Sequence, residues 1–396
     1  MPSRVLLLLA LVPSFLACAA GDAPSDRAIR IDTIDAVVHV ANPGEGLWTE
    51  ETRWKVDETR ALVIGTLDGP EEYVFGEIAG VVASKDGRVY IADAQAAEVR
   101  IFSEAGDLLG RFGRDGEGPG EFRDISGLGR APAGGVATLD GSLSRVSVFQ
   151  SDGTFRRSFK LERPYVMIRR GSPIRFDAAG RFYDQAGFSV RPGVDTLGVV
   201  RYASDGSVED TVVAIIHEPR QIMLQRDGVP VMSIPLPFAP RPSVAVGPDG
   251  RIFAASGDEY RIAELGPEGD TVRVTARPVE RVAVGEAERE EVRALVEDAY
   301  RNATGSAPRD LPRFPEWKAP VETIHVDETG HLWVLVPSPS GSTAMTWDVL
   351  DPEGRFLGQV ALPRMFVMHI GERSVAGVVL DELEVPRVMV LPVERG

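Results

Sequence analysis

Residues 81–112 read VVASKDGRVYIADAQAAEVRIFSEAGDLLGRF, and this stretch decides the fold. Residues 128–159, LGRAPAGGVATLDGSLSRVSVFQSDGTFRRSF, align with it without a gap, 47 residues later. The matching positions are Gly87 with Gly134, Val89 with Val136, Asp93 with Asp140, Val99 with Val146, Phe102 with Phe149, Gly106 with Gly153 and Phe112 with Phe159. In each unit a glycine turn precedes a strand-length run of β-branched or aromatic residues, and a second glycine turn follows 19 residues after the first. This pattern predicts a repeated meander of short antiparallel strands.

The same unit recurs along the rest of the chain. Further glycine pairs with apolar runs are Gly180 with Gly206, Gly250 with Gly269, and Gly330 with Gly354. Three strand-like runs at 366–370, 374–380 and 387–393 form a sixth unit that lacks one strand, and we expect residues 54–65 to supply it. Closing a ring in this way removes the open sheet edges. The sequence therefore predicts an all-β fold, a six-bladed β-propeller of four-stranded antiparallel blades, with a short inserted helix.

Several segments carry a family resemblance. DGRVYIAD at 86–93, VRIF at 99–102 and GRDGEGPGEF at 113–122 resemble an NHL repeat. PFAPR at 237–241, YRI at 260–262 and DEL at 381–383 resemble exported bacterial six-bladed β-propellers of unassigned activity. The resemblance covers about residues 54–396 and implies the fold, but it implies no particular chemistry. NHL propellers include scaffolds, RNA binders, carbohydrate binders and a few enzymes.

Composition and charge exclude several classes of protein. The 396 residues contain 43 Lys and Arg against 59 Asp and Glu, a net charge of −16. Nucleic acid is therefore excluded as the expected partner, because its binding needs a basic surface. With 43% hydrophobic residues, the chain has ample material for a core. Its single cysteine excludes an internal disulfide.

The N-terminus has the features of an export signal. Arg4 precedes an apolar run at residues 5–12, which is too short to span a bilayer. Cys18 follows Phe15-Leu16-Ala17, and this placement resembles the lipobox of bacterial lipoproteins, although Leu16 stands where that family has a small residue. The resemblance implies cleavage before Cys18 and a lipid anchor there. Ordinary signal cleavage around residues 17–20, giving a soluble secreted protein, is the alternative.

These observations predict the organisation and location of the chain. We expect a signal peptide at 1–17, a flexible tether at 18–45 and the propeller at 46–396. The mature protein is predicted to be a membrane-anchored lipoprotein, periplasmic or on the cell surface of a bacterium, and a monomer.

Two stretches exceed the repeat, at about 217–240 and 285–320. The first holds an apolar, proline-rich run, and we favour a hairpin extension that packs on its own blade over a ligand-binding wall. In the second, Val292, Leu295, Val296 and Ala299 follow the spacing of an amphipathic helix. We expect this helix to lie across a mouth of the ring, either as a lid over a site or as a structural brace.

The sequence lacks the residues that most of the catalytic sites considered for this fold require. Calcium-dependent lactonases of the six-bladed class use Glu, Asp and typically several Asn. This chain has only Asn42 and Asn302, so an all-carboxylate divalent-cation site is the remaining option of that kind. His325 and His369 sit late in the first strands of adjacent blades and are weak metal candidates. The equivalent positions in the other blades (Val82, Gly129, Arg175 and Ala245) supply no third ligand. We therefore assign no catalytic residue and expect no cofactor.

Four residues are candidates for binding at the mouth of the channel: Asp93, Asp140, Tyr260 and Arg261. The two aspartates end aligned strands at a loop, so they could line one face. However, short carboxylates in such places usually cap backbone amides, and we favour that structural role.

Two hypotheses about function follow. The first is a non-enzymatic binding or scaffold module, anchored by lipid outside the cytoplasm, whose partner is a protein, peptide or glycan. The alternative is a metal-dependent hydrolase or lyase with its site in the central channel.

Overall fold

The computed structural model describes residues 28–132, 134–162, 174–191, 194–226, 228–308 and 310–396. The predicted signal peptide and Cys18 lie outside the described residues. Among the described residues, no helix is both long enough and apolar enough to cross a membrane.

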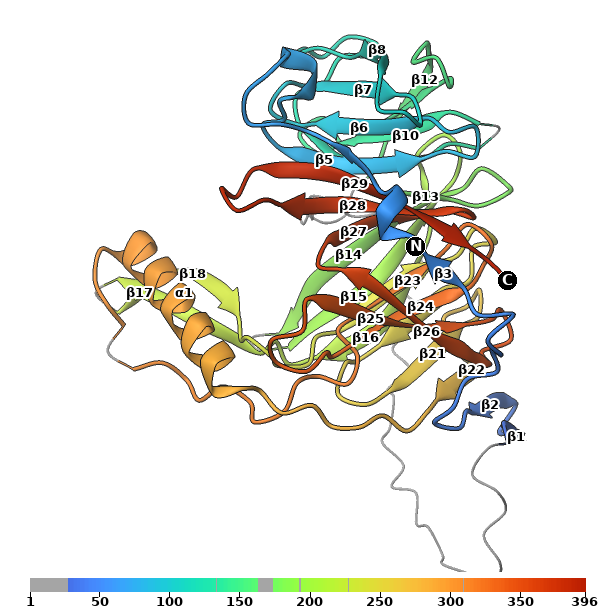
Figure 1. The fold of residues 1–396 in the computed structure, drawn as a ribbon, viewed down its shortest axis with the longest axis vertical. Coiled ribbons are helices and arrows are strands. Elements are labelled where there is room, and N and C mark those ends of the chain that lie inside the picture. Colours follow the sequence, from blue (N-terminus) through green and yellow to red (C-terminus); the bar gives the residue numbers. More distant parts are fainter. Residues whose placement is uncertain (1–27, 133, 163–173, 192–193, 227, 309) are drawn as a thin grey trace, which may run out of the picture.

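The strands form six four-stranded antiparallel blades, as predicted (Figure 1). The first three blades consist of β5 (Ile78–Ala83), β6 (Val89–Asp93), β7 (Glu98–Phe102) and β8 (Leu108–Phe112); β9 (Ile125–Arg130), β10 (Val136–Asp140), β11 (Arg145–Phe149) and β12 (Phe155–Lys160); and β13 (Arg175–Phe176), β14 (Phe182–Arg191), β15 (Val194–Tyr202) and β16 (Val208–His217).

The remaining blades follow the same order. They consist of β19 (Ser243–Val246), β20 (Ile252–Ala255), β21 (Arg261–Leu265) and β22 (Thr271–Ala276); β23 (Thr323–Val326), β24 (Leu332–Val336), β25 (Ala344–Leu350) and β26 (Phe356–Pro363); and β27 (Phe366–Ile370), β28 (Ser374–Leu380) and β29 (Pro386–Glu394), completed by N-terminal strands.

The two ends of the ring differ in the connections that they carry. A meander of four antiparallel strands returns to the end where it began, so all links between blades lie at one end. We call this end the entry mouth, since every innermost strand begins there. The exit mouth is the opposite end, where the innermost strands finish and short turns lead to the second strands.

Each pair of neighbouring blades shares a hydrophobic core. Six buried clusters of this kind join successive blades around the ring, the last between the sixth blade and the first. The cluster between the fifth and sixth blades contains Trp54, Trp333 and Trp347, with the indoles of Trp54 and Trp333 5.9 Å apart. The core is therefore a closed belt of side chains, and a blade is stable only between its neighbours.

Aspartates hold the turns at the exit mouth. Asp327 is fully buried and accepts hydrogen bonds from the backbone amides of Thr329 and His331 and from the indole of Trp333. Its turn needs Gly330, whose φ of +87° disfavours other residues. Burial opposes the charge of Asp327, but contacts with the His331 and Thr329 side chains and the Arg395 guanidinium outweigh it and lower its pKa to about 2. The recurring glycines of the sequence are thus turn residues.

The ring is closed by strands from the N-terminal end, as the sequence predicts. β4 (Leu62–Ile64) and β3 (Lys55–Val56) pair antiparallel with β29. Two 3-10 turns, η1 (Glu58–Arg60) and η2 (Glu71–Tyr73), connect these strands to each other and to the first blade. The sixth blade therefore contains both ends of the propeller sequence.

Residues 28–45 do not form the flexible tether that we expected from the sequence. β1 (Arg30–Ile34) and β2 (Val37–Ala41) form a hairpin, and β2 pairs in parallel with β22 at the outer edge of the fourth blade. Asn42 is buried, donating to the carbonyl of Gly354 at 2.9 Å and accepting from the amide of Phe356 at 2.7 Å. Hydrogen bonds to two different blades attach this segment to the ring.

The two insertions pack against each other. The first forms a hairpin, β17 (Gln221–Arg226) and β18 (Val229–Pro235), and the second contains helix α1 (Glu286–Thr304). Ile222 and Leu224 of the hairpin share a small core with Val296 of the helix and with Phe314. The hairpin expectation is confirmed, but its core partner is α1 and not its own blade. Leu295, expected on the buried face, is instead 62% exposed.

This pair of insertions projects from the body of blades (Figure 1). Because the hairpin follows β16 and the helix follows β22, both leave the ring at the entry mouth. Lys318 ties the helix to the fifth blade by pairing with Glu288 at 2.7 Å and donating to the carbonyl of Ser338 at 2.9 Å. The observed packing of α1 is that of a brace for the hairpin.

Substitutions in β4 test the closure of the ring. Ile64 is 2% exposed and packs between the sixth and first blades, so Ile64→Ala should lower the free energy of unfolding by about 2–5 kcal/mol. Val63 is 45% exposed in the same strand, and Val63→Ala should change it by about 0.5 kcal/mol or less. Urea unfolding followed by tryptophan fluorescence measures both, and equal losses would contradict the proposed role of β4.

Candidate functional site

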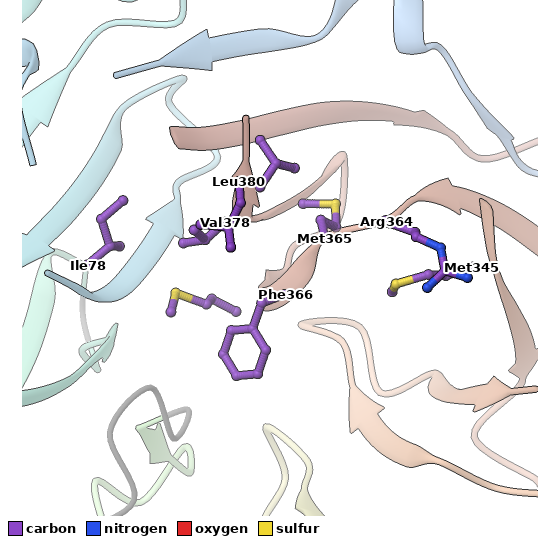
Figure 2. A pocket seen from close by; sticks show the side chains of 9 residues that line it. Ile78, Met345, Arg364, Met365, Phe366, Val378 and Leu380 are labelled. Carbon is purple, nitrogen blue, oxygen red and sulfur yellow. The ribbon is translucent and has the colours of Figure 1, made fainter. Parts of the chain in front are cut away.

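An apolar groove crosses the entry mouth at the fifth, sixth and first blades (Figure 2). Its volume is about 690 Å³, within the range of ligand-binding sites. Eight of its nine lining residues are apolar, and Arg364 is the exception. The others include Ile78, Met345, Met365, Phe366, Met368, Val378 and Leu380. The groove follows strand ends, because Ile78 and Phe366 begin innermost strands and Leu380 ends β28.

Several apolar side chains at this mouth face solvent. Phe366 is 59% exposed and Leu380 is 65% exposed. On the β17–β18 hairpin, which projects from the blades and does not line the groove, Val229 and Val231 are also exposed, at 63% and 47%. Contiguous exposed apolar surface on a soluble protein marks an interaction site more often than chance exposure does. The repeat pattern does not predict this groove, because its residues lie on separate blades. Its only trace in the sequence is an apolar residue at the first or last position of several strands.

The structure places Asp93 and Asp140 at the entry mouth, as their alignment predicts, but both are buried at 1% exposure. Asp93 accepts from the backbone amides of Gly76, Glu77, Gln95 and Ala96. Asp140 accepts from the amides of Arg123, Asp124 and Leu143. These contacts match the capping role that the sequence favours. Their role as ligand contacts stays a prediction.

Tyr260 and Arg261 lie away from the channel, contrary to the expectation of a channel-mouth position. Tyr260 is 5% exposed between the fourth and fifth blades, next to β21, the third strand from the centre. Arg261 begins the same strand with an exposed side chain. Sequence position could not distinguish inner strands from outer ones at this point.

Tyr260 packs beside a buried ion pair. The Arg277 Nε lies 3.2 Å from Asp348 Oδ2, and Asp348 is fully buried. Arg277 also covers the ring of Phe356 at 4.0 Å. Burial raises the pKa of Asp348 despite the guanidinium, and burial raises the pKa of Tyr260 well above its usual range. The arrangement joins two blades, and its atoms are not open to a ligand.

His325 and His369 lie in the exit half of the innermost strands of adjacent blades, as the sequence predicts. His325 stacks edge-on against Trp347, with the ring centres 5.5 Å apart. His369 is 4% exposed, and its Nε2 lies 3.1 Å from Glu328 Oε1. Glu328 also pairs with Arg130 at 3.1 Å. The structure therefore adds Glu328 and Arg130 to this group, which the repeat alignment did not indicate.

The surroundings disfavour positive charge on both imidazoles. Burial lowers the pKa of His325 to about 4, and the nearby Arg175 guanidinium acts in the same direction. Burial also lowers the pKa of His369, more than its hydrogen bond to Glu328 raises it. Both histidines are thus neutral near pH 7.

No metal centre is assembled in the part of the chain that the structure describes. There, no three side chains of His, Cys, Asp or Glu are placed to hold one ion. His325 and His369 are accompanied by Glu328, but Glu328 is already engaged by His369 and Arg130. The site that these residues do form is a charged network at the exit mouth.

The comparisons with known proteins concern the fold. No family model and no curated protein matches the chain. A Bacteroides fragilis protein with a provisional description as an exported protein covers 90% of this chain and 99% of its own, at 12% identity and a TM-score of 0.45. Catalytically inactive virginiamycin B lyase from Staphylococcus aureus, with quinupristin, covers 86% and 99% at 11% identity and a TM-score of 0.42.

A third solved structure, with a provisional description as a gluconolactonase, covers 92% of this chain and 98% of its own at 14% identity and a TM-score of 0.40. At such identities and scores, the similarity carries no argument about activity. The blades themselves define the class of protein, a six-bladed β-propeller.

The lowered pKa values of His325 and His369 predict how the stability of the protein depends on pH. Their folded pKa values lie below the unfolded value of about 6.5, so the unfolded state takes up protons first as the pH falls. Stability should be fully present above that value and should fall toward pH 4. His325→Gln should flatten this dependence, by up to about 1.4 kcal/mol per pH unit in the free energy of unfolding. Urea unfolding between about pH 7.5 and 4.5 measures the difference.

The charged groups that face these histidines are Arg175 for His325, and Glu328, Arg175 and Arg130 for His369. His217→Gln, at the entry end of β16, is the matched control. A His325→Gln profile parallel to that of the unsubstituted protein would contradict the assignment.

Proposed function

We propose that this protein is a non-enzymatic binding module that acts outside the cytoplasm and takes an apolar peptide segment in the groove at its entry mouth. The open apolar groove is the observation that carries the proposal. Export rests on the signal-like N-terminus, and lipid anchoring rests on Cys18. The signal-like segment and Cys18 lie outside the residues that the structure describes, so export and lipid anchoring rest on the sequence.

The shape and lining of the groove favour a peptide over a glycan. The groove extends over three blades, from Met345 of the fifth to Ile78 of the first. Glycan sites need many hydrogen-bonding groups, whereas here eight of nine lining residues are apolar. Met345 is partly exposed and provides flexible, polarizable surface, which suits apolar side chains of varied shape. Met365 and Met368 also line the groove, but they are only 6% and 9% exposed.

Arg364, the charged residue of the lining, favours a ligand that carries a carboxylate. The Arg364 Nε donates to the carbonyl of Ser342 at 2.9 Å, which orients the guanidinium. The remaining nitrogen atoms can pair with a carboxylate, and arginine favours bidentate contacts of this kind. The expected ligand is an extended apolar peptide with an acidic side chain or a C-terminal carboxylate at the Arg364 end.

Synthetic octapeptides test this function directly. A peptide of apolar residues ending in Asp should bind at least about tenfold more tightly than the same peptide ending in Lys, a difference of about 1.4 kcal/mol. Phe366→Asp should weaken binding of the acidic peptide by about tenfold or more, because it places a charge in the groove. Isothermal titration calorimetry measures both affinities.

Leu383→Asp is the matched control, since Leu383 is 71% exposed and does not line the groove. It should leave peptide affinity within about twofold. The proposal would be refuted if Phe366→Asp and Leu383→Asp bound the acidic peptide with equal affinity, or if the protein bound oligosaccharides and no peptide. Turnover of lactone, ester or lyase substrates that is lost on chelation and in His369→Ala would instead support the metal-dependent enzyme predicted as the alternative.

A further inference from the structure

Several charged residues lie close together at the exit mouth, and none of them lines the groove. Lys85 pairs with Glu372 at 2.7 Å, Arg130 with Glu328 at 3.1 Å, and Arg395 with Asp327 at 2.8 Å. Each of these cations has a carboxylate of its own. The arrangement is the usual solution for charges near a protein interior, where an unpaired ion is costly.

Arg175 departs from this pattern. It lies in β13 in the third blade, at the repeat position of His325 and His369, and its Nη2 donates to the carbonyl of Val326 in the fifth blade at 2.8 Å. The side chain therefore reaches across the ring to a non-adjacent blade. Among the described residues, no carboxylate lies within 4.0 Å of its guanidinium, and burial lowers the pKa of Arg175.

The neighbours of Arg175 do not neutralise it. The charge of Arg175 lowers the pKa values of His325 and His369, and both histidines are neutral near pH 7. The nearest acidic residues are Glu328 and Asp327, which act on Arg175 at longer range. Glu328 is engaged by Arg130 and His369, and Asp327 by Arg395 and Trp333. Among the described residues at this mouth, Arg175 is therefore a cation without a carboxylate partner.

We propose that the exit end of the channel is a binding site for a small oxyanion, a carboxylate or a phosphate, held by Arg175. A planar guanidinium presents paired N–H donors that match the oxygen atoms of either group. Solvent can reach this region, because the side chain of Arg130 is 31% exposed and Arg175 itself is partly exposed. The site lies at the opposite mouth from the peptide groove and is independent of it.

Anion binding should stabilise the full-length protein. At fixed ionic strength in chloride, sodium acetate or inorganic phosphate at ten times its Kd should raise the Tm by about 2 °C. Comparison of acetate with phosphate shows which group the site prefers. Because an anion offsets the charge of Arg175, the same addition should raise the pKa values of His325 and His369, which NMR titration of labelled histidines measures.

Arg175→Gln should abolish the shift in Tm and the response of both histidines. Arg157→Gln is the matched control, because Arg157 is an exposed arginine that also donates to one carbonyl, that of Ser204 at 2.7 Å. This control should respond to acetate and phosphate as the unsubstituted protein does.

Stability without oxyanions separates this role from a structural one. If Arg175 serves to hold an anion, Arg175→Gln removes a partly buried charge that has no carboxylate partner, and the variant should melt at the same temperature or higher in chloride buffer. A markedly lower Tm for Arg175→Gln in that buffer would show that the arginine is a brace and would overturn the proposal. An unchanged anion response in Arg175→Gln would overturn it equally. Neither result bears on peptide binding at Phe366, so the two proposals fail separately.

Discussion

The pairing of β4 with β29 is the constraint on which the rest of the structure depends. Every blade buries its two faces against its neighbours, so an open ring would leave two apolar faces in water. Residues 62–64 and 388–390, which lie at opposite ends of the chain, form the closing ladder. Trp54 adds its indole to the core between the fifth and sixth blades. Local turns and strands can form early, but the closed belt of cores exists only when both ends have met.

Closure also determines where polar groups can be buried. Several buried charged side chains are held by partners, as Asp327 and the Arg277–Asp348 pair show. These contacts join blade to blade or turn to strand, and they account for aspartates that would otherwise resemble binding residues. Arg175 differs because its contact is a carbonyl and its surroundings contain neutral histidines. A partner from outside the chain would complete the pattern.

The two mouths of the ring have different surfaces. The entry mouth carries the links between blades, and through them the two insertions and the apolar groove. The exit mouth carries short turns, which leave little room for added sequence and concentrate charged residues near the ends of the innermost strands. The two proposed sites, for an apolar peptide and for an oxyanion, lie at opposite ends of this division. The whole chain has a net charge of −16, so the unpaired positive charge of Arg175 contrasts with the overall charge of the protein.

The repeat, the number of blades, the glycine turns, the closing strand and the inserted helix could all be predicted from the sequence. These features are local or periodic, because turn chemistry and strand alternation act over a few residues. Long-range packing places β2 against the fourth blade, gives the two insertions a shared core, and buries Tyr260 between blades. It also decided the groove at Phe366 and the isolated position of Arg175. Each of these depends on residues far apart in the chain, and their distances are set only when six packed blades close into a ring.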